Sequence, residues 1–284
     1  MTRTKTVPSL VLPEGLLWNA QTKSFEFVDI QACRFLRYDH LTGTISIVKT
    51  FKKNISWFFP CSDKVSYIIG LKDQIIIWNS KTDTQEVKSH LNLKPSQRFN
   101  DALCIEGEKI WFGVTGTLDN DHNNDGGLFS YSAENIKLED ENYLIPNGPL
   151  LTLNGKHLLH SDSLRGQVFC YEYENRKINP ISKRVVLDVS KSRGEPDGMC
   201  LDSDGNIYIA IWGLGEIWRL SPSLILLDKF PTPYRYVTNV AFGGNDLDHL
   251  LVTYAEDKSR NIEGGIHSLL GHNSFGVHSG VWIL

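Results

Sequence analysis

The feature of this chain that most restricts its fold is a sequence unit that recurs about six times. Strong copies begin at Glu14, Asn100, Asn147 and Asp197, and weaker copies run over 65–80 and 238–255. Strong copies in the middle of the chain start 47 and 50 residues apart, and the first interval of 86 residues fits two units. Repeats of this length built only from short strands are typical of β-propeller blades. The repeat therefore predicts an all-β fold, a six-bladed β-propeller that forms a single domain over residues 1–284.

The strand pattern inside one unit supports this prediction. After Asp197 the chain reads MCLD, a turn SDGN, the run IYIAIW, a turn with Gly213, and the strand EIWRL. The run IYIAIW is apolar almost throughout, as expected of a strand that neighbouring blades cover on both faces. The strand EIWRL alternates, so that Ile217 and Arg219 share one face. No stretch has a sustained helical period, and no linker rich in proline, glycine or serine divides the chain.

The two ends of the chain are predicted to complete the ring. The segment KTVPSLVL (5–12) is expected to supply the outer strand of the last blade, which leaves no open seam. The tail LLGHNSFGVHSGVWIL (269–284) is expected to close the same blade. The polar segment TLDNDHNNDGG (117–127) is expected to form an exposed loop.

Composition narrows the class of function. A formal net charge of −4 and a pI near 6.1 give no electrostatic reason to expect a nucleic-acid or membrane partner. The longest apolar runs are too short to span a bilayer. The five cysteines are odd in number and form no CxxC pair, which is typical of free thiols in a reducing compartment. We expect a cytoplasmic protein that is a monomer or a weak homodimer.

The residues that open the strong copies form a candidate site. In a propeller, equivalent positions of successive blades meet around one central channel, so Glu14, Asn100, Asn147 and Asp197 are expected to converge. Two carboxylates and an amide oxygen suit a hard divalent ion such as Ca²⁺, Mg²⁺ or Mn²⁺, and Zn²⁺ is an alternative. Asp and Asn also commonly cap turns, which explains any one of the four. Their joint placement favours a metal site in the channel.

The motifs in this chain resemble those of the senescence-marker-protein/gluconolactonase/luciferin-regenerating-enzyme family, which includes regucalcin. They are PEG (13–15), FVDI (27–30), RFND (98–101), WFG (111–113), PNG (146–148) and PDGMC (196–200). They follow one another in the family's order and cover essentially the whole chain. Members of that family are six-bladed propellers that hydrolyse sugar lactones with one divalent cation in the channel.

The resemblance implies roles for individual residues. Glu14, Asn147 and Asp197 are expected to hold the metal, with Asp197 also acting as the general base. Arg98 and Asn100 are expected to bind the substrate. After WFG the family usually continues with a Thr-Met pair, whereas this chain has VTGTLD (114–119). Asp119 is expected to replace a family acidic residue that contacts the sugar.

The sequence therefore predicts metal-dependent hydrolysis of aldonolactones, with Ca²⁺ as the preferred ion and a small sugar lactone as the partner. Two alternatives use the same site: hydrolysis of organophosphates or aryl esters, and calcium binding by a regulatory propeller without catalysis. A metal-free propeller that serves as a scaffold for protein partners is a third.

Overall fold

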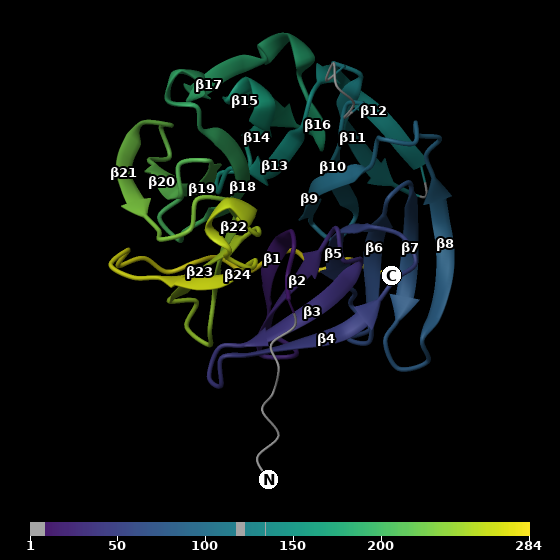
Figure 1. The fold of residues 1–284 in the computed structure, drawn as a ribbon. Coiled ribbons are helices and arrows are strands. Elements are labelled where there is room, and N and C mark those ends of the chain that lie inside the picture. The colour runs from purple at the N-terminus through teal and green to yellow at the C-terminus, as the bar shows by residue number, and fades with distance from the viewer. Residues whose placement is uncertain (1–8, 118–122, 134) are drawn as a thin grey trace.

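The computed structural model describes residues 9–117, 123–133 and 135–284. Within these residues the chain forms six antiparallel sheets arranged around a central channel (Figure 1). The predicted six-bladed β-propeller is confirmed. In five blades the strands follow one another in chain order from the channel outward, and in blade 4 the last two strands both pair with the third. The innermost strands of neighbouring blades contact one another around the ring, the first and last blades included.

The first three blades each contain four strands. Blade 1 consists of β1 (Pro13–Asn19), β2 (Ser24–Asp29), β3 (Arg34–Asp39) and β4 (Thr44–Thr50). Blade 2 consists of β5 (Ile55–Pro60), β6 (Ser66–Leu71), β7 (Gln74–Asn79) and β8 (Thr84–His90). Blade 3 consists of β9 (Phe99–Ile105), β10 (Lys109–Val114), β11 (Gly126–Ser132) and β12 (Asn135–Tyr143).

The last three blades are less uniform. Blade 4 consists of β13 (Pro146–Leu151), β14 (His157–Asp162), β15 (Gln167–Glu174), β16 (Lys177–Ile178) and β17 (Arg184–Asp188). Blade 5 consists of β18 (Glu195–Leu201), β19 (Ile207–Trp212), β20 (Glu216–Leu220) and β21 (Leu226–Pro231). Blade 6 consists of β22 (Val237–Gly243), β23 (His249–Tyr254) and β24 (Gly265–Leu269). Four short 3₁₀ helices within the described residues are η1 (Ser163–Arg165), η2 (Pro180–Ser182), η3 (Ser190–Ser192) and η4 (Lys258–Arg260).

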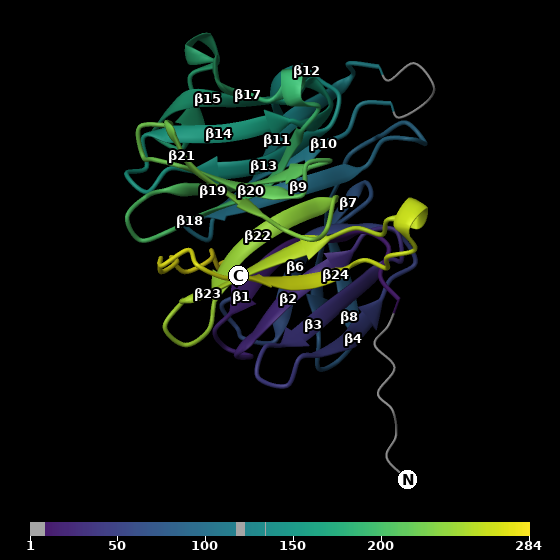
Figure 2. The same ribbon diagram turned by 60° about the vertical axis from the view of Figure 1, so that its left-hand side comes forward.

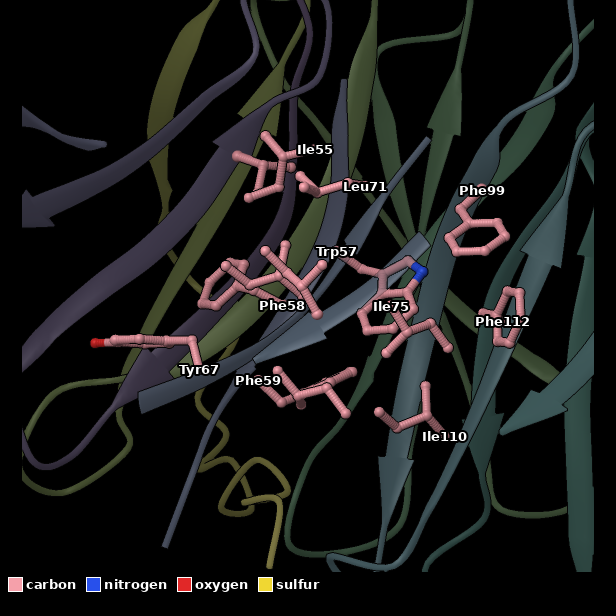
Figure 3. Close-up of a cluster of buried hydrophobic side chains, with 14 of the residues drawn as sticks. Ile55, Trp57, Phe58, Phe59, Tyr67, Leu71, Ile75, Phe99, Ile110 and Phe112 are labelled. Carbon is pink, nitrogen blue, oxygen red and sulfur yellow. The ribbon is translucent and has the colours of Figure 1, made fainter. Parts of the chain in front are cut away.

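Apolar side chains fill the space between blades. The largest cluster joins blades 1, 2 and 3, and Figure 3 shows its part around Trp57. The Trp57 ring stacks on Phe99 with ring centres 6.2 Å apart and lies 5.8 Å from Phe112. Gly70 makes room for the indole, because a Cβ there would lie 2.2 Å from it. The apolar middle strands predicted from sequence are therefore covered on both faces.

The innermost strands share an irregularity that positions the channel side chains. In all six described blades the pairing between the first and second strands shifts register close to the start of the innermost strand. Such bulges bend a strand locally and re-aim its side chains. We call the end of the channel where these strands begin the polar end, and the opposite end the capped end.

The first and last blades close the ring directly. Thr238 Oγ1 in β22 donates a hydrogen bond of 2.6 Å to the Pro13 carbonyl at the start of β1. Leu10 forms a single antiparallel bridge with Gly264, just before β24, and is almost fully buried. The described part of the predicted outer strand thus contacts the last blade, whereas residues 5–8 of that prediction lie outside the described residues.

The prediction that the C-terminal tail closes the last blade is wrong. After β24 the tail leaves blade 6 and crosses the capped end of the channel (Figure 2). Its backbone forms hydrogen bonds successively with Ser203 of blade 5, Leu247 of blade 6, Pro60 and Ser62 of blade 2, and Gly107 of blade 3. The Trp282 side chain packs against the core between blades 2 and 3, which holds the end of the tail away from blade 6.

Among the described residues, no helix has the length and apolar character that a membrane-spanning helix needs.

Candidate active site

The four polar residues predicted to converge lie on four different innermost strands. Glu14 is on β1, Asn100 on β9, Asn147 on β13 and Asp197 on β18, each close to the bulge near the polar end. All four are buried, with exposed fractions between 3% and 7%. Buried polar side chains need partners, so their contacts indicate what the site is built to do.

A chain of hydrogen bonds links three blades through these side chains. Asn100 Nδ2 donates to the Pro146 carbonyl at 2.9 Å and to Asn147 Oδ1. Asn147 Nδ2 donates to Ser163 Oγ at 2.9 Å, and Ser163 Oγ donates to the Pro196 carbonyl at 2.8 Å. Each amide is thus fixed in orientation, and the Asn147 amide oxygen is directed toward the other polar side chains.

Gly148 allows blades 4 and 5 to approach at this point. Its φ of +49° lies in the left-handed region that favours glycine, and a Cβ would lie 2.6 Å from the Asp197 carbonyl oxygen. The glycine of the PNG motif is therefore required by backbone geometry next to the polar side chains.

Acidic side chains are crowded together at the polar end. Burial, followed by the charge of Asp101, raises the pKa of Glu14 to about 8. Burial also raises the pKa of Asp101 to about 6. The pKa of Asp197 is raised well above its ordinary value, first by burial and then by the charges of Glu14, Asp101 and Glu195. Arg98 is the cation that offsets this repulsion, and burial lowers its own pKa.

One atom of this cluster has no partner. Asp197 Oδ1 is buried and makes no hydrogen bond to the described residues. An unpaired carboxylate oxygen in a buried, negatively charged cluster is unfavourable unless a cation binds there. The described residues contain no group of three or more His, Cys, Asp or Glu side chains arranged for a metal. The predicted set instead combines two carboxylates with the Asn147 amide oxygen, an all-oxygen donor set that fits a hard divalent ion.

The comparison with known families agrees with this geometry. A family model described as the SMP-30/gluconolactonase/LRE-like region matches residues 12–256. The chain belongs to this family. The matched segment includes all of the polar side chains described above. It covers the strands of all six blades apart from β24, and it ends before the C-terminal tail.

Individual members of the SMP-30/gluconolactonase/LRE-like family resemble the whole chain. Regucalcin of Danio rerio is 26% identical over 247 residues, which cover 85% of this chain and 82% of that protein. Pentonolactonase XacC of Haloferax volcanii is 28% identical over 267 residues, 90% of this chain and 86% of that protein. A solved structure from Agrobacterium tumefaciens, described as a calcium-binding protein, regucalcin, superimposes with a TM-score of 0.88 at 20% identity and covers 98% of this chain and 95% of that one.

The structure brings together most of the residues that the sequence singled out. Arg98 Nη1 donates to the Phe99 carbonyl at 2.9 Å and to Asn100 Oδ1. Its charge acts on both Glu14 and Asp197. Arg98 therefore lies in the same cluster as the four channel residues. Asp119, predicted to contact the sugar, lies outside the described residues.

Sequence reasoning did not assign Asp101 or Asn239 to the site of this family member. Asp101 follows Asn100 in the RFND motif, and its carboxylate accepts hydrogen bonds from the backbone N–H of Ala102 at 2.8 Å and of Gly148 at 3.0 Å. Asn239 lies on β22 in the weak last copy of the repeat, and its side chain interacts with Glu14. Both lie on innermost strands, so the repeat was the sequence signal that could have identified them.

Asp29 and Asp162 hold the backbone that leads into two of these strands. The Asp29 carboxylate accepts from the N–H groups of Val11 at 2.9 Å and Leu12 at 3.1 Å. Asp162 accepts in the same way from Leu144 at 3.0 Å and from the next residue at 3.2 Å. These carboxylates therefore fix the approach to Glu14 and Asn147 through the main chain.

Proposed function

We propose that this protein hydrolyses sugar lactones with one divalent cation held by Glu14, Asn147 and Asp197. The observation that carries the proposal is the unpaired Asp197 Oδ1, buried beside a second carboxylate and a fixed amide oxygen at the polar end. Membership of a family in which one relative is named a pentonolactonase supports the same reaction.

Calcium is the preferred ion for this site. The proposed ligands offer only oxygen atoms, and Ca²⁺ accepts carboxylate and amide oxygens in flexible geometry. Mg²⁺, Mn²⁺ and Zn²⁺ are alternatives, although Zn²⁺ usually takes nitrogen or sulfur ligands as well. When bound, the ion would polarise the lactone carbonyl and lower the pKa of a water molecule.

The side chains around the site supply the remaining chemistry. Asp197 accepts a proton from the water that attacks the lactone carbonyl carbon, and this proton passes to the ring oxygen as the ring C–O bond breaks, which gives a hydroxy acid. Arg98, fixed by its bonds to Phe99 and Asn100, orients the lactone through its hydroxyl groups or its carbonyl region. Burial of the cluster keeps bulk water away and strengthens these interactions.

The test uses protein stripped of metal with a chelator, with Ca²⁺, Mn²⁺, Mg²⁺ or Zn²⁺ added back. Proton release is followed with a panel of aldonolactones, and a reaction without enzyme corrects for spontaneous ring opening. Asp197→Asn is expected to lower kcat/KM by at least about a hundredfold, because it removes both a ligand and the base. Asp204→Asn, an exposed turn residue of blade 5, is the matched control and should keep wild-type rates.

Two results would redirect the assignment. Turnover of aryl esters or organophosphates without turnover of any lactone would assign the site to the alternative hydrolytic reaction. Calcium binding measured by calorimetry and lost in Asp197→Asn, without turnover of any substrate, would indicate a regulatory calcium-binding propeller; the relative described as a calcium-binding protein favours this second candidate. Wild-type lactone hydrolysis by Asp197→Asn would contradict the proposed chemistry.

A further inference from the structure

The site has a second charged residue at its mouth that the proposed chemistry does not use. Arg98 comes two positions before Asn100, and Glu195 comes two positions before Asp197. Arg98 directly precedes β9 and Glu195 is the first residue of β18, so both lie one step further out toward the polar end. The equivalent positions of the other blades hold Leu12, Asn54, Ile145 and Val237. Arg98 and Glu195 are therefore the charged residues of this outer layer.

The two residues differ in how they are held. Arg98 is tied to the Phe99 carbonyl and to the Asn100 side chain. Glu195 has neither a hydrogen bond nor an ion pair from its carboxylate to the described residues, although it is partly buried. Its charge reaches Asp197, which places it close to the proposed catalytic carboxylate. A partly buried carboxylate without a partner leaves its acceptor oxygens available to a ligand.

Aromatic side chains stand beside Glu195. In the pairing of β18 with β19, Glu195 lies directly opposite Trp212, so the two side chains point to the same face of blade 5. The Trp212 ring lies 4.7 Å from the Tyr236 ring, which precedes β22 of blade 6. Two hydrogen bonds between Gly213 and Arg235 hold this wall together. The Gly213 N–H donates to the Arg235 carbonyl at 3.0 Å, and the side-chain Nε of Arg235 donates to the Gly213 carbonyl at 3.3 Å.

We propose that Glu195, with the aromatic wall of Trp212 and Tyr236, forms a hydroxyl-binding subsite that selects neutral cyclic polyols over anionic ones. The carboxylate accepts hydrogen bonds from ring hydroxyl groups, and the aromatic wall packs against the apolar C–H face of the ring. The Glu195 carboxylate repels a phosphate or carboxylate group brought to the same place, so a phosphorylated or carboxylated ring is disfavoured there. The choice of a sugar lactone as the natural ligand rests on the proposed function.

The experiment measures binding and turnover separately. The binding probes are 1,5-anhydro-D-glucitol, a neutral ring that cannot be hydrolysed, and its 6-phosphate, titrated into Ca²⁺-loaded protein by calorimetry. Turnover is compared for glucono-1,5-lactone and its 6-phosphate. The variants are Glu195→Gln, which removes the charge, and Glu195→Asp, which keeps the charge but shortens the side chain. Glu256→Gln removes a carboxylate elsewhere at the polar end, where Glu256 pairs with Lys258 at 3.2 Å, and serves as control.

The wild-type protein is expected to prefer the neutral probe. Glu195→Gln should weaken binding of the neutral probe about tenfold and raise KM for the neutral lactone with little change in kcat, as loss of a hydrogen bond to a charged group predicts. It should also reduce the preference for the neutral over the phosphorylated ring. Glu195→Asp should weaken binding of the neutral probe but keep discrimination against phosphate. Thermal unfolding checks that each variant is folded.

The outcomes separate this inference from the proposed function. If the wild-type protein hydrolyses neutral lactones but Glu195→Gln keeps both its affinity and its preference, the subsite is wrong while the lactonase assignment stands. If the wild-type protein shows no turnover, the proposed function fails. The calorimetric binding of the two probes then tests by itself whether Glu195 forms the subsite. A wild-type preference for the phosphorylated probe overturns the inference in either case.

Discussion

The two ends of the channel are built on opposite principles. At the polar end Glu14, Asp101 and Asp197 are crowded together in a buried site, and one carboxylate oxygen has no partner. At the capped end the C-terminal tail packs so closely that Gly276 and Gly280 have no room for a side chain. The first arrangement is unfavourable for the isolated chain and suited to a ligand. The second is favourable packing that connects blades.

A cavity of about 460 Å³ separates the two ends. Gly15, Asp101 and Asn239 line it toward the polar end, and residues 277–280 of the tail line it toward the capped end. The proposed reaction site and the packing that stabilises the fold thus lie at different ends of one channel. Substitutions at the capped end should therefore change stability without changing ion binding, whereas substitutions at the polar end should abolish ion binding with only a small effect on stability.

The largest effect is expected at the capped end. A Cβ at Gly276 would lie 2.1 Å from the Cβ of Phe242, so Gly276→Val forces the tail away from blade 6. Overpacking of this kind should lower the free energy of unfolding by about 3 kcal/mol, measured by denaturant titration. Leu270→Ala, at an exposed position of the same tail, is the control. Loss of Ca²⁺ binding by folded Gly276→Val would break the proposed separation of the two ends.

A smaller effect on stability is expected when the pH is lowered, and it comes from His160, which lies on β14 in the wall of the ring. Burial, followed by the charge of Lys183, lowers its pKa to about 3, and neither ring nitrogen has a hydrogen-bond partner among the described residues. The unfolded chain takes up a proton near pH 6.5 and the folded chain does not, so stability is full above that pH and falls as the pH falls. Between pH 6.5 and 5 the loss should be about 2 kcal/mol.

His160→Phe should remove this component of the pH dependence, because phenylalanine cannot be protonated. Denaturant titrations of the wild type and the variant at pH 7.5, 6.5 and 5 test it. His278→Gln, which removes an exposed imidazole in the tail, should leave the pH dependence as in the wild type. An identical slope in His160→Phe and the wild type would show that the buried imidazole is not responsible.

The smallest effect on stability is expected at the polar end, and it is a stabilisation of the fold. In metal-free protein at pH 9, above the pKa of about 8 for Glu14 and of about 6 for Asp101, Glu14→Gln removes one of two repelling charges and should stabilise the fold by about 1 kcal/mol. The same change should abolish Ca²⁺ binding, since a ligand is lost. Chelator-treated samples compared by denaturant titration, with calorimetry for the ion, measure both. A destabilised Glu14→Gln variant would mean that the cluster is held by contacts stronger than its repulsion.

Part of this arrangement could be predicted from the sequence because the repeat carries it. Periodic strands fixed the blade number, and repeat-opening residues marked Glu14, Asn100, Asn147 and Asp197, since equivalent positions in a ring share one location. Blade 2 was harder, because its weak copy at 65–80 begins after β5, whose residues ISWFFP are apolar around a single serine. Glu195 carried no signal, because its importance depends on the pairing with Trp212.

The tail could not be predicted for a different reason. Residues 269–284 lie outside any repeat, and their contacts are with blades 2, 3, 5 and 6, far away in the sequence. An apolar Trp282 in such a segment indicates burial but not the location. Only the three-dimensional position of the gap between blades 2 and 3 determines where that ring packs.

The closure between β1 and β22 has a consequence for when the site can exist. Glu14 belongs to the first blade to leave the ribosome, Asp197 to the fifth, and Asn239, which interacts with Glu14, to the last. Contacts this distant in sequence form late in folding because loop closure is costly. A nascent chain or a ring opened at this seam lacks the complete set of ligands. Binding of the proposed cation would therefore report that synthesis and closure are finished, and by mass action the ion would hold the seam shut.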